Sequence, residues 1–518
     1  MVVVLLMPTA FAWAQQVGSG ASETQSAAMS AAIHDLQQQV SELRAAVAEV
    51  RSEAAQYRAE TAQLRKELQA TRDQLATESP VPAYPNQTAP AEAPAAVQVP
   101  ASPSPLRPAS LEDRVASLEE STQLLNGKID EQYQTKVASA SRYRVRLSGI
   151  VLMNLFDNRG AVDNQDFPTW ATPVPMAGPN GVFGATLRQS EIGLEVFGPT
   201  LAGAKTSGEV SADFSGGFPN LVNGVTSGLF RLRTADLRLD WDQTSLVIGQ
   251  DNLFLSPLSP TSFASLAVPS LSYAGNLWGW IPQVRVEHRF DLSENDKITL
   301  QAGILDNLDG EEPYFAPENQ PSAGEGAGQP GYGLRTAWTR TVFGQPMTFG
   351  AAGYYARQAW GFGHHTDGWA GMTDWQIPLP ARLSLSGEFY RGFAIGGFGG
   401  ALGRSVLFSD QPGLPGTAVH GLNTIGGWSQ LKFKAMAKLE FNGGIGVDSP
   451  YAKDLGTFNN PQGYLPFLAQ NRGAVVNFIY RPRSNLLFST EYHRLRTFSY
   501  ESASWTANQV NGVMGILF

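Results

Sequence analysis

The clearest pattern in the chain is an alternation of apolar and polar residues that starts near residue 143 and continues to the C-terminus. Between residues 143 and 155 every odd position is apolar, aromatic or glycine, whereas the even positions include Arg144, Arg146 and Asn154. A period of two predicts a β-strand with one apolar and one polar face. The alternation recurs in about sixteen segments, near residues 143, 185, 204, 229, 244, 281, 297, 331, 346, 368, 381, 426, 438, 472, 485 and 504.

The connections between these segments fall into two length classes. Tight joints near residues 198, 291, 344, 378 and 481 are each followed, one segment later, by a long loop rich in Gly, Pro and Asn. Short turns at one rim and long loops at the other are typical of an outer-membrane barrel, and a soluble β-sandwich would not divide its loops in this way. Residues 143–518 therefore predict an all-β transmembrane antiparallel barrel of about sixteen strands.

The last strand supports this prediction. Alternate residues back from the C-terminus are apolar or glycine, namely Val510, Gly512, Met514, Ile516 and Phe518. A chain that ends within its final strand on phenylalanine resembles the substrates of the barrel assembly machinery. We expect these five residues to form the barrel-assembly signal.

A different period governs the segment before the barrel. In residues 29–78, apolar residues alternate spacings of three and four, and three glutamates each precede an arginine by five residues: Glu53 and Arg58, Glu60 and Arg65, Glu67 and Arg72. This arrangement is the g-to-e′ pairing of neighbouring helices in a parallel coiled coil. A single solvated helix with charge stripes is the alternative. The seam does not by itself distinguish a dimer from a trimer.

Two further segments join this helix to the barrel. Residues 79–110 are rich in Pro and Ala and predict an extended, semi-rigid linker. Ser110 then precedes a second short coiled-coil helix, residues 111–135, with Asp113 placed for a capping box. The order of elements thus predicts an α-helical periplasmic arm in front of the barrel.

Composition agrees with export and with a barrel. Residues 1–14 are an apolar run ending in Ala12-Trp13-Ala14 and predict a signal peptide. After them no apolar stretch is long enough for a membrane-spanning helix. The chain has 53 Gly and 27 Phe, only 16% charged residues and no cysteine, so disulfides and zinc-thiolate sites are excluded. A net charge of −9 argues against a nucleic-acid partner.

Short motifs then suggest a family. The sequence Arg231-Leu-Arg233 with Ala235, followed by Val247-Ile-Gly249-Gln250 and a long loop, resembles the DcaP-like porins, which are related to the phosphate-selective porins. The resemblance implies a sixteen-stranded trimer that passes small anionic solutes, with the loop after the fifth strand, here residues 252–279, folded into the channel. The chain departs from phosphate-selective members because it lacks an uninterrupted ladder of inward arginines.

Charged residues on the polar faces are the candidate pore lining. They are Arg144, Arg146, Lys205, Glu209, Asp213, Arg238, Arg285, Glu287, Arg289, Arg335, Arg382 and Glu388. Opposed charges in a lumen sort solutes by charge, although many such residues brace the wall instead. We expect mild anion preference, with Arg285 and Arg289 on the selective part. Arg231 and Arg233 share parity with outward residues, so either a bulge or a position near the lipid headgroups must place them.

Other functions lack comparable signals. No catalytic residue, cofactor or metal site is assigned: His364, His365 and Asp367 read as surface loop residues, and no G-x-S-x-G element occurs. We therefore expect a non-enzymatic porin for passive diffusion of small hydrophilic solutes. An envelope-tethering structural protein and an outer-membrane enzyme are the alternatives. The expected partners are further copies in a trimer, outer-membrane lipid, the barrel assembly machinery and peptidoglycan.

Overall fold

The computed structural model describes residues 136–137, 143–176, 178–217, 228–311, 320–458, 468–501 and 503–518. The predicted signal peptide, coiled coil, linker and second helix lie outside these residues and stay predictions.

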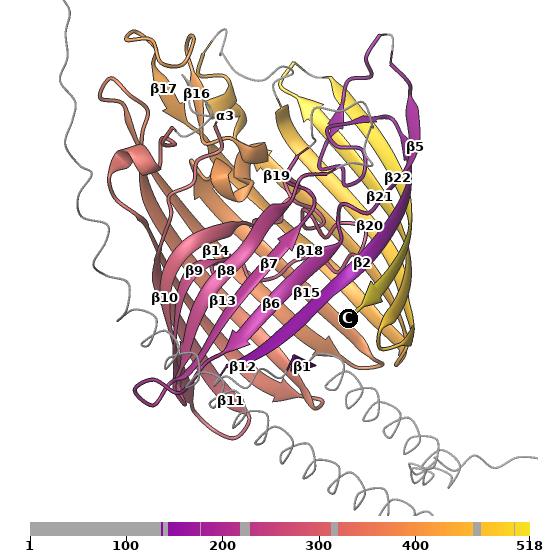
Figure 1. The fold of residues 1–518 in the computed structure, drawn as a ribbon. Coiled ribbons are helices and arrows are strands. Elements are labelled where there is room, and N and C mark those ends of the chain that lie inside the picture. Colours follow the sequence, from indigo (N-terminus) through magenta and orange to yellow (C-terminus); the bar gives the residue numbers. More distant parts are fainter. Residues whose placement is uncertain are drawn as a thin grey trace, which may run out of the picture. The chain divides into compact units, whose positions relative to one another are not determined.

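The described chain forms a closed antiparallel barrel in which each strand pairs with its neighbour along the chain (Figure 1). The wall consists of β2 (Arg144–Arg159), β5 (Gly181–Thr186), β6 (Glu191–Phe197), β7 (Lys205–Asp213), β8 (Arg231–Asp240), β9 (Thr244–Asn252), β10 (Trp280–Asp291), β11 (Asp296–Leu305), β12 (Gly331–Val342), β13 (Gln345–Ala359), β14 (His365–Leu379), β15 (Leu383–Phe393), β18 (Asn423–Met436), β19 (Leu439–Pro450), β20 (Leu468–Arg483), β21 (Leu486–Ser499) and β22 (Ser504–Leu517).

The predicted number of strands is confirmed. β5 and β6 pair with the two halves of β2 and together make one position in the wall. The two-residue β1 (Lys136–Val137) only adds a short pairing to β2. The sheet has 18 strands. Counting β5 and β6 as one position and leaving out β1 gives sixteen positions in the wall. β22 pairs with β2 from Leu517↔Ile150 onward, and Phe518 exchanges two backbone hydrogen bonds with Gly149, so the last residues close the barrel.

The smaller elements all lie in the long loops. They are β3 (Ala161–Val162), β4 (Ala171–Thr172), β16 (Val406–Phe408), β17 (Val419–Gly421), the 3-10 helices η1 (Glu325–Ala327), η2 (Gly396–Phe398) and η3 (Gly400–Gly403), and the short helix α3 (Ala452–Leu455). The long loops gather at the upper rim in Figure 1 and the short turns at the lower rim, as predicted. None of the described helices is long and apolar enough to cross a membrane.

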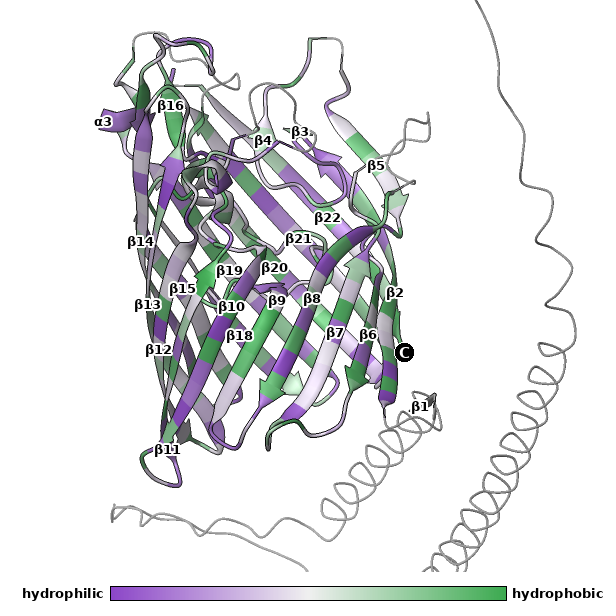
Figure 2. Ribbon diagram, turned by 60° about the vertical axis from the view of Figure 1, so that its left-hand side comes forward, coloured by the Kyte–Doolittle hydropathy of each residue, from purple (hydrophilic) through white to green (hydrophobic). Residues whose placement is uncertain are grey.

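Hydrophobic and hydrophilic residues alternate along the strands of the wall (Figure 2), and burial shows that the two faces differ as this alternation predicts. On β2, Asn154 and Asn158 are buried inside, whereas Val151, Met153 and Leu155 are exposed outside. Aromatic side chains meet across strands on the outer face, at Tyr332–Tyr355 near the long loops and at Trp338–Phe349 and Phe433–Phe441 near the short turns. Apolar outer side chains between two aromatic belts are typical of a barrel that lies in a lipid bilayer.

Candidate permeation pathway

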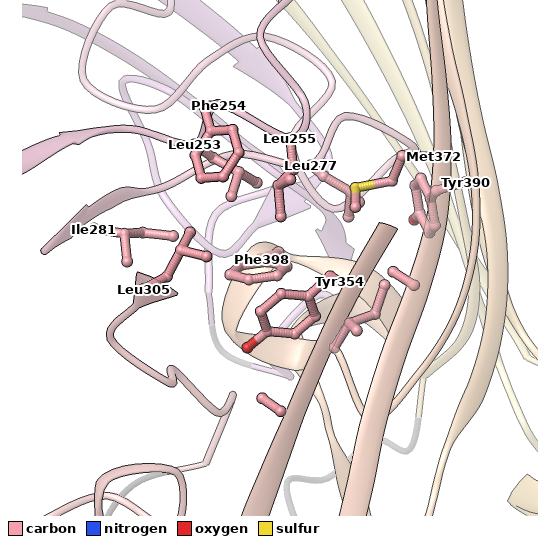
Figure 3. Packing of buried hydrophobic residues seen from close by; sticks show 13 residues of the cluster. Leu253, Phe254, Leu255, Leu277, Ile281, Leu305, Tyr354, Met372, Tyr390 and Phe398 are labelled. Carbon is pink, nitrogen blue, oxygen red and sulfur yellow. The ribbon is translucent and has the colours of Figure 1, made fainter. Parts of the chain in front are cut away.

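The loop after β9, residues 253–279, folds into the lumen instead of leaving it. Its two ends meet where the Leu253 N–H donates to the Gly279 carbonyl at 3.0 Å. Leu253, Phe254 and Leu255 are buried against wall residues from β10 to β15 and against Phe398 of η2, in the loop between β15 and β18 (Figure 3). This apolar cluster fixes the base of the loop to one side of the barrel.

The middle of the loop is anchored to wall strands far away in the sequence. The Glu388 carboxylate on β15 accepts from the Ser256 hydroxyl at 2.6 Å, from the Leu258 N–H at 2.8 Å and from the Trp428 indole at 3.2 Å. The Thr261 N–H donates to Gln430 on β18 at 2.7 Å. Because three donors converge on one buried carboxyl group, this contact determines where the loop lies.

The loop then reaches the opposite side of the lumen. Gln189, in the break between β5 and β6, donates to the Ala264 carbonyl at 2.8 Å, and its side-chain oxygen accepts from the N–H groups of Leu266 and Ala267. Phe263, Ala264 and Leu266 pack on Ile150, Leu152 and Leu487 of the wall. The inward loop predicted for residues 252–279 is therefore present, and it spans the lumen.

Glycines in the wall make room for the returning part of the loop. A Cβ on Gly446 would lie 2.2 Å from the Ala274 carbonyl oxygen, and one on Gly473 would lie 2.5 Å from the Leu271 side chain. Larger residues at either position would push the loop off β19 and β20. Some of the many glycines in the composition thus serve the constriction.

A β-bulge settles the position of Arg231 and Arg233. The register between β7 and β8 pairs Ser211 with Thr234 and then Ala212 with Leu232, which leaves Arg233 as the extra residue. The bulge turns both arginines inward. Arg231 donates to buried Asp213 at 2.6 Å and to the Ala267 carbonyl at 2.7 Å, whereas Arg233 pairs with Glu191. These arginines brace the wall and hold the loop.

Near the short turns, one part of the wall carries a row of carboxylates. Glu195 on β6, Glu209 on β7 and Asp236 on β8 stand directly opposite one another across the strands. Glu195 pairs with Arg146, whereas no cation lies within 4.0 Å of Glu209 or Asp236 in the described part of the chain. Glu209 is exposed. We name this row, Glu195, Glu209 and Asp236, the acidic wall.

The wall around β18, eight strand positions from β8, is basic. Lys432 and Lys434 on β18 and Arg382 in the turn before β15 line a cavity of about 680 Å³ beneath Leu258 and Thr261 of the loop. Lys432 and Asp236 both lie four residues from the short-turn end of their strands. Lys432 has one carboxylate, Glu440, at 4.0 Å. We name Arg382, Lys432 and Lys434 the basic wall.

The other predicted lining residues are mostly compensated. Arg285 is 7% exposed and bonds Asp251 on the neighbouring β9 at 2.7 Å and Glu287 on its own strand at 2.8 Å, so these two carboxylates offset its charge. Arg335 is buried with Asp374, and Arg238 bonds Asp240. Arg289 donates to backbone carbonyls, whereas Lys205 and Arg144 are exposed near the short turns, with Arg144 over the Phe197 ring.

The alternation pattern did not reveal the polar side chains that anchor the loop. Gln189, Gln430 and Asn477 all bond the loop, but an uncharged residue on an inner face gives no sign of its partner. The only signal for Gln189 is the break in alternation between β5 and β6. Asp367 is paired with Arg357, and no cluster of three or more His, Asp or Glu side chains within the described ranges is placed to hold a metal.

Comparisons with known proteins agree at the level of the fold. No protein-family model and no curated protein sequence matches the chain. The crystal structure of the outer membrane channel DcaP of Acinetobacter baumannii superposes with a TM-score of 0.55 at 15% identity, covering 74% of this chain and 100% of that chain. The fold is that of the DcaP channel.

The predicted resemblance to DcaP-like porins is thus confirmed for the architecture. An anion-selective porin from Comamonas acidovorans matches with a TM-score of 0.43 at 10% identity, covering 73% of this chain and 100% of that one. OprB of Pseudomonas putida matches with a TM-score of 0.43 at 11% identity, covering 76% and 97%.

Proposed function

We propose that this chain is an outer-membrane porin through which small hydrophilic solutes diffuse passively. The observation that carries the proposal is the uncharged loop, which crosses a sixteen-stranded lumen and leaves a cavity of about 680 Å³ beside it. Barrels of sixteen strands are wide enough for an aqueous channel. A loop held across such a channel narrows it to a size filter without closing it.

We further propose mild anion preference. The loop supplies no charge, because residues 252–279 contain no Asp, Glu, Lys or Arg. The sign of the constriction is therefore set by the walls. In the acidic wall Glu195 pairs with Arg146, and in the basic wall Lys432 has Glu440 at 4.0 Å. We assign the sign to the basic wall, because Arg382, Lys432 and Lys434 line the cavity beside the loop and no residue of the acidic wall does.

The direct test is conductance of the purified full chain in planar bilayers, together with swelling of liposomes in neutral sugars of increasing size. We expect discrete conductance steps and a swelling rate that falls with sugar mass, because the loop limits the pore width. A folded protein, identified by its heat-modifiable gel mobility, that gives neither steps nor swelling would contradict the proposal.

The assembly and its location follow as part of the same proposal. The barrel would lie in the outer membrane as a trimer, inserted by the barrel assembly machinery through Val510, Gly512, Met514, Ile516 and Phe518, with the coiled coil in the periplasm near peptidoglycan. The exposed side chains of Val510, Met514 and Ile516 in β22, and of Phe518 directly after it, support the assembly signal. Native mass spectrometry of detergent-extracted protein should give trimers, and a spectrum of monomers alone would contradict this assembly.

A further inference from the structure

The outer face of the barrel carries three arginines close together near the long-loop rim. Arg472 lies four residues from the upper end of β20, and Arg494 and Arg496 lie five and three residues from the upper end of β21. Their neighbours along the strands, Asn471 and Leu495, are buried on the inner face. All three arginine side chains are exposed and point away from the lumen.

The three guanidinium groups form one compact surface. Arg472 stands directly opposite Arg496 across the strands, and both lie against the ring of Phe498, at 5.1 Å and 4.8 Å from its centre. Arg494 lies two residues further along β21. Like charges placed directly opposite each other in a sheet destabilise it. The ring holds both cations in place but neutralises neither.

Other outward arginines have partners on the protein. Arg357 pairs with Asp367 at 2.8 Å, Arg159 with Asp157 at 3.1 Å and Arg340 with Asp296 at 3.8 Å. Arg391 donates to the Asn423 side chain and lies 4.4 Å from the ring centre of Tyr451. By contrast, no carboxylate of the residues described lies within 4.0 Å of Arg472, Arg494 or Arg496, and only Gln470 accepts from Arg472. The cluster therefore lacks the carboxylate that Arg357, Arg159 and Arg340 each have.

The wall toward the short turns supplies the complementary apolar surface. Below the arginines, the outward side chains of β20 to β22 are exposed and apolar or aromatic, namely Val476, Phe478, Tyr480, Phe488, Val510, Met514 and Ile516. A charged side chain on a lipid-facing wall is unfavourable in proportion to its depth. A molecule with phosphate groups at one end and hydrocarbon chains at the other would cover both parts of this surface.

We infer that Arg472, Arg494 and Arg496 bind the phosphate groups of a phosphorylated lipid of the outer leaflet, whose acyl chains lie on the apolar wall below. Arginine is suited to this role because its planar guanidinium bonds phosphate oxygens in pairs. Two opposed arginines and a third nearby fit a headgroup with more than one phosphate. The inference rests on the proposed outer-membrane location but not on conduction.

The test compares the full-length wild type with a triple variant, Arg472→Gln, Arg494→Gln and Arg496→Gln, in detergent. Native mass spectrometry would follow binding of bis-phosphorylated lipid A and of its dephosphorylated form. An arginine near a membrane surface contributes about fivefold to the affinity for an anionic lipid, so we expect roughly a hundredfold loss in the triple variant if the three contributions add. The dephosphorylated lipid should bind both proteins equally weakly.

The matched control is the double variant Arg357→Gln, Asp367→Asn, which removes an outward arginine together with its carboxylate and should bind lipid A as the wild type does. Equal binding of lipid A by wild type and triple variant would overturn the inference. So would dissociation of the variant into monomers without a change in lipid binding, because this face would then be a subunit interface, or full displacement by millimolar inorganic phosphate. Bilayer conductance of the triple variant, expected unchanged, separates this result from a failure of the porin proposal.

Discussion

The acidic and basic walls face each other across the same lumen, but only the basic wall lines the cavity beside the loop. In the acidic wall, Glu195, Glu209 and Asp236 stand in one cross-strand row, and arginines on β2 and β8 lie among them. In the basic wall, Lys432 and Lys434 lie two residues apart, with Glu440 as the near carboxylate. Like charges side by side destabilise a sheet unless solvent or counter-charges offset them. The comparison indicates that both walls depend on mobile counter-ions, and that the basic wall is the one that presents its charges to the cavity beside the loop.

The largest expected effect comes from removing the loop that separates the two walls. Replacing residues 259–275 by a short Gly-Ser linker keeps the buried base at Leu253, Phe254 and Leu277. We expect single-channel conductance to rise at least about twofold and the swelling cutoff to move to larger sugars, because the loop spans the lumen. Unchanged conductance in a folded variant would show that another segment forms the constriction.

Reversing the basic wall should change selectivity next most strongly. In the variant Lys432→Glu, Lys434→Glu, we expect the reversal potential in a salt gradient to shift toward cations, because two exposed or half-exposed cations become anions beside the loop. The shift should exceed that of Arg285→Glu, Arg289→Glu, since Arg285 already shares its charge with Asp251 and Glu287. A larger shift of the reversal potential in the Arg285→Glu, Arg289→Glu variant would show that β10, and not the basic wall, carries the selective charge.

Neutralising the acidic wall should act in the opposite direction. For Glu209→Gln, Asp236→Asn we expect stronger anion preference and a smaller change than for the lysine reversal, because two charges are removed and none is reversed. The effect should weaken as salt increases, since exposed charges are screened over about 10 Å at 0.1 M. Reversal potentials at low and high salt would check this. A shift of selectivity toward cations in this variant would contradict the placement of Glu209 and Asp236 on the water-filled side of the wall.

The anchor beside the basic wall should control stability more than selectivity. Glu388→Gln replaces a carboxylate that accepts three hydrogen bonds from the loop and from Trp428. A lost acceptor at a buried site costs about 1–3 kcal/mol, so we expect a lower thermal unfolding temperature and more open-channel noise. The variant Glu491→Gln should act in the same direction, because Glu491 accepts from Asn477 at 3.0 Å and Asn477 holds the Thr261 carbonyl of the loop. A Glu388→Gln variant with the channel noise and unfolding temperature of the wild type would contradict the role of Glu388 in holding the loop.

The smallest expected effect lies outside both walls, in the loop after β11. Burial raises the pKa of Glu311 to about 8, although it accepts N–H groups of Ser405 and Val406. Because the pKa in the folded protein lies above the ordinary value of 4.5, this group's contribution to stability is full below pH 4.5 and is lost as the pH rises through 8. Amide exchange at residues 405–406, corrected for its intrinsic rate, should rise toward pH 9 in the wild type but not in Glu311→Gln.

The architecture was readable from sequence because it follows a local rule. Each strand must alternate apolar and polar residues to separate lipid from lumen, so counting the alternating segments predicted sixteen strands. Arg231 and Arg233 fall on the outward positions of this alternation, which required an irregularity in the strand, and the structure shows it to be a β-bulge. The inward position of residues 252–279 was implied by the resemblance to DcaP-like porins and not by the alternation. The path of the loop across the lumen could not be predicted from the sequence. Glu388 lies 132 residues from Ser256, and the two meet only because the closed barrel brings distant strands together. The same holds for which charges are compensated, as Arg285 illustrates.

The reversal potential of the wild-type channel in a potassium chloride gradient tests the central claim most directly, because it reports the sign of the constriction without any substitution. The uncharged loop, the compensated arginines of β10 and the exposed basic wall together predict a modest preference for chloride that grows at low salt. A channel that prefers potassium under these conditions would contradict the assignment of the selective charge to Arg382, Lys432 and Lys434.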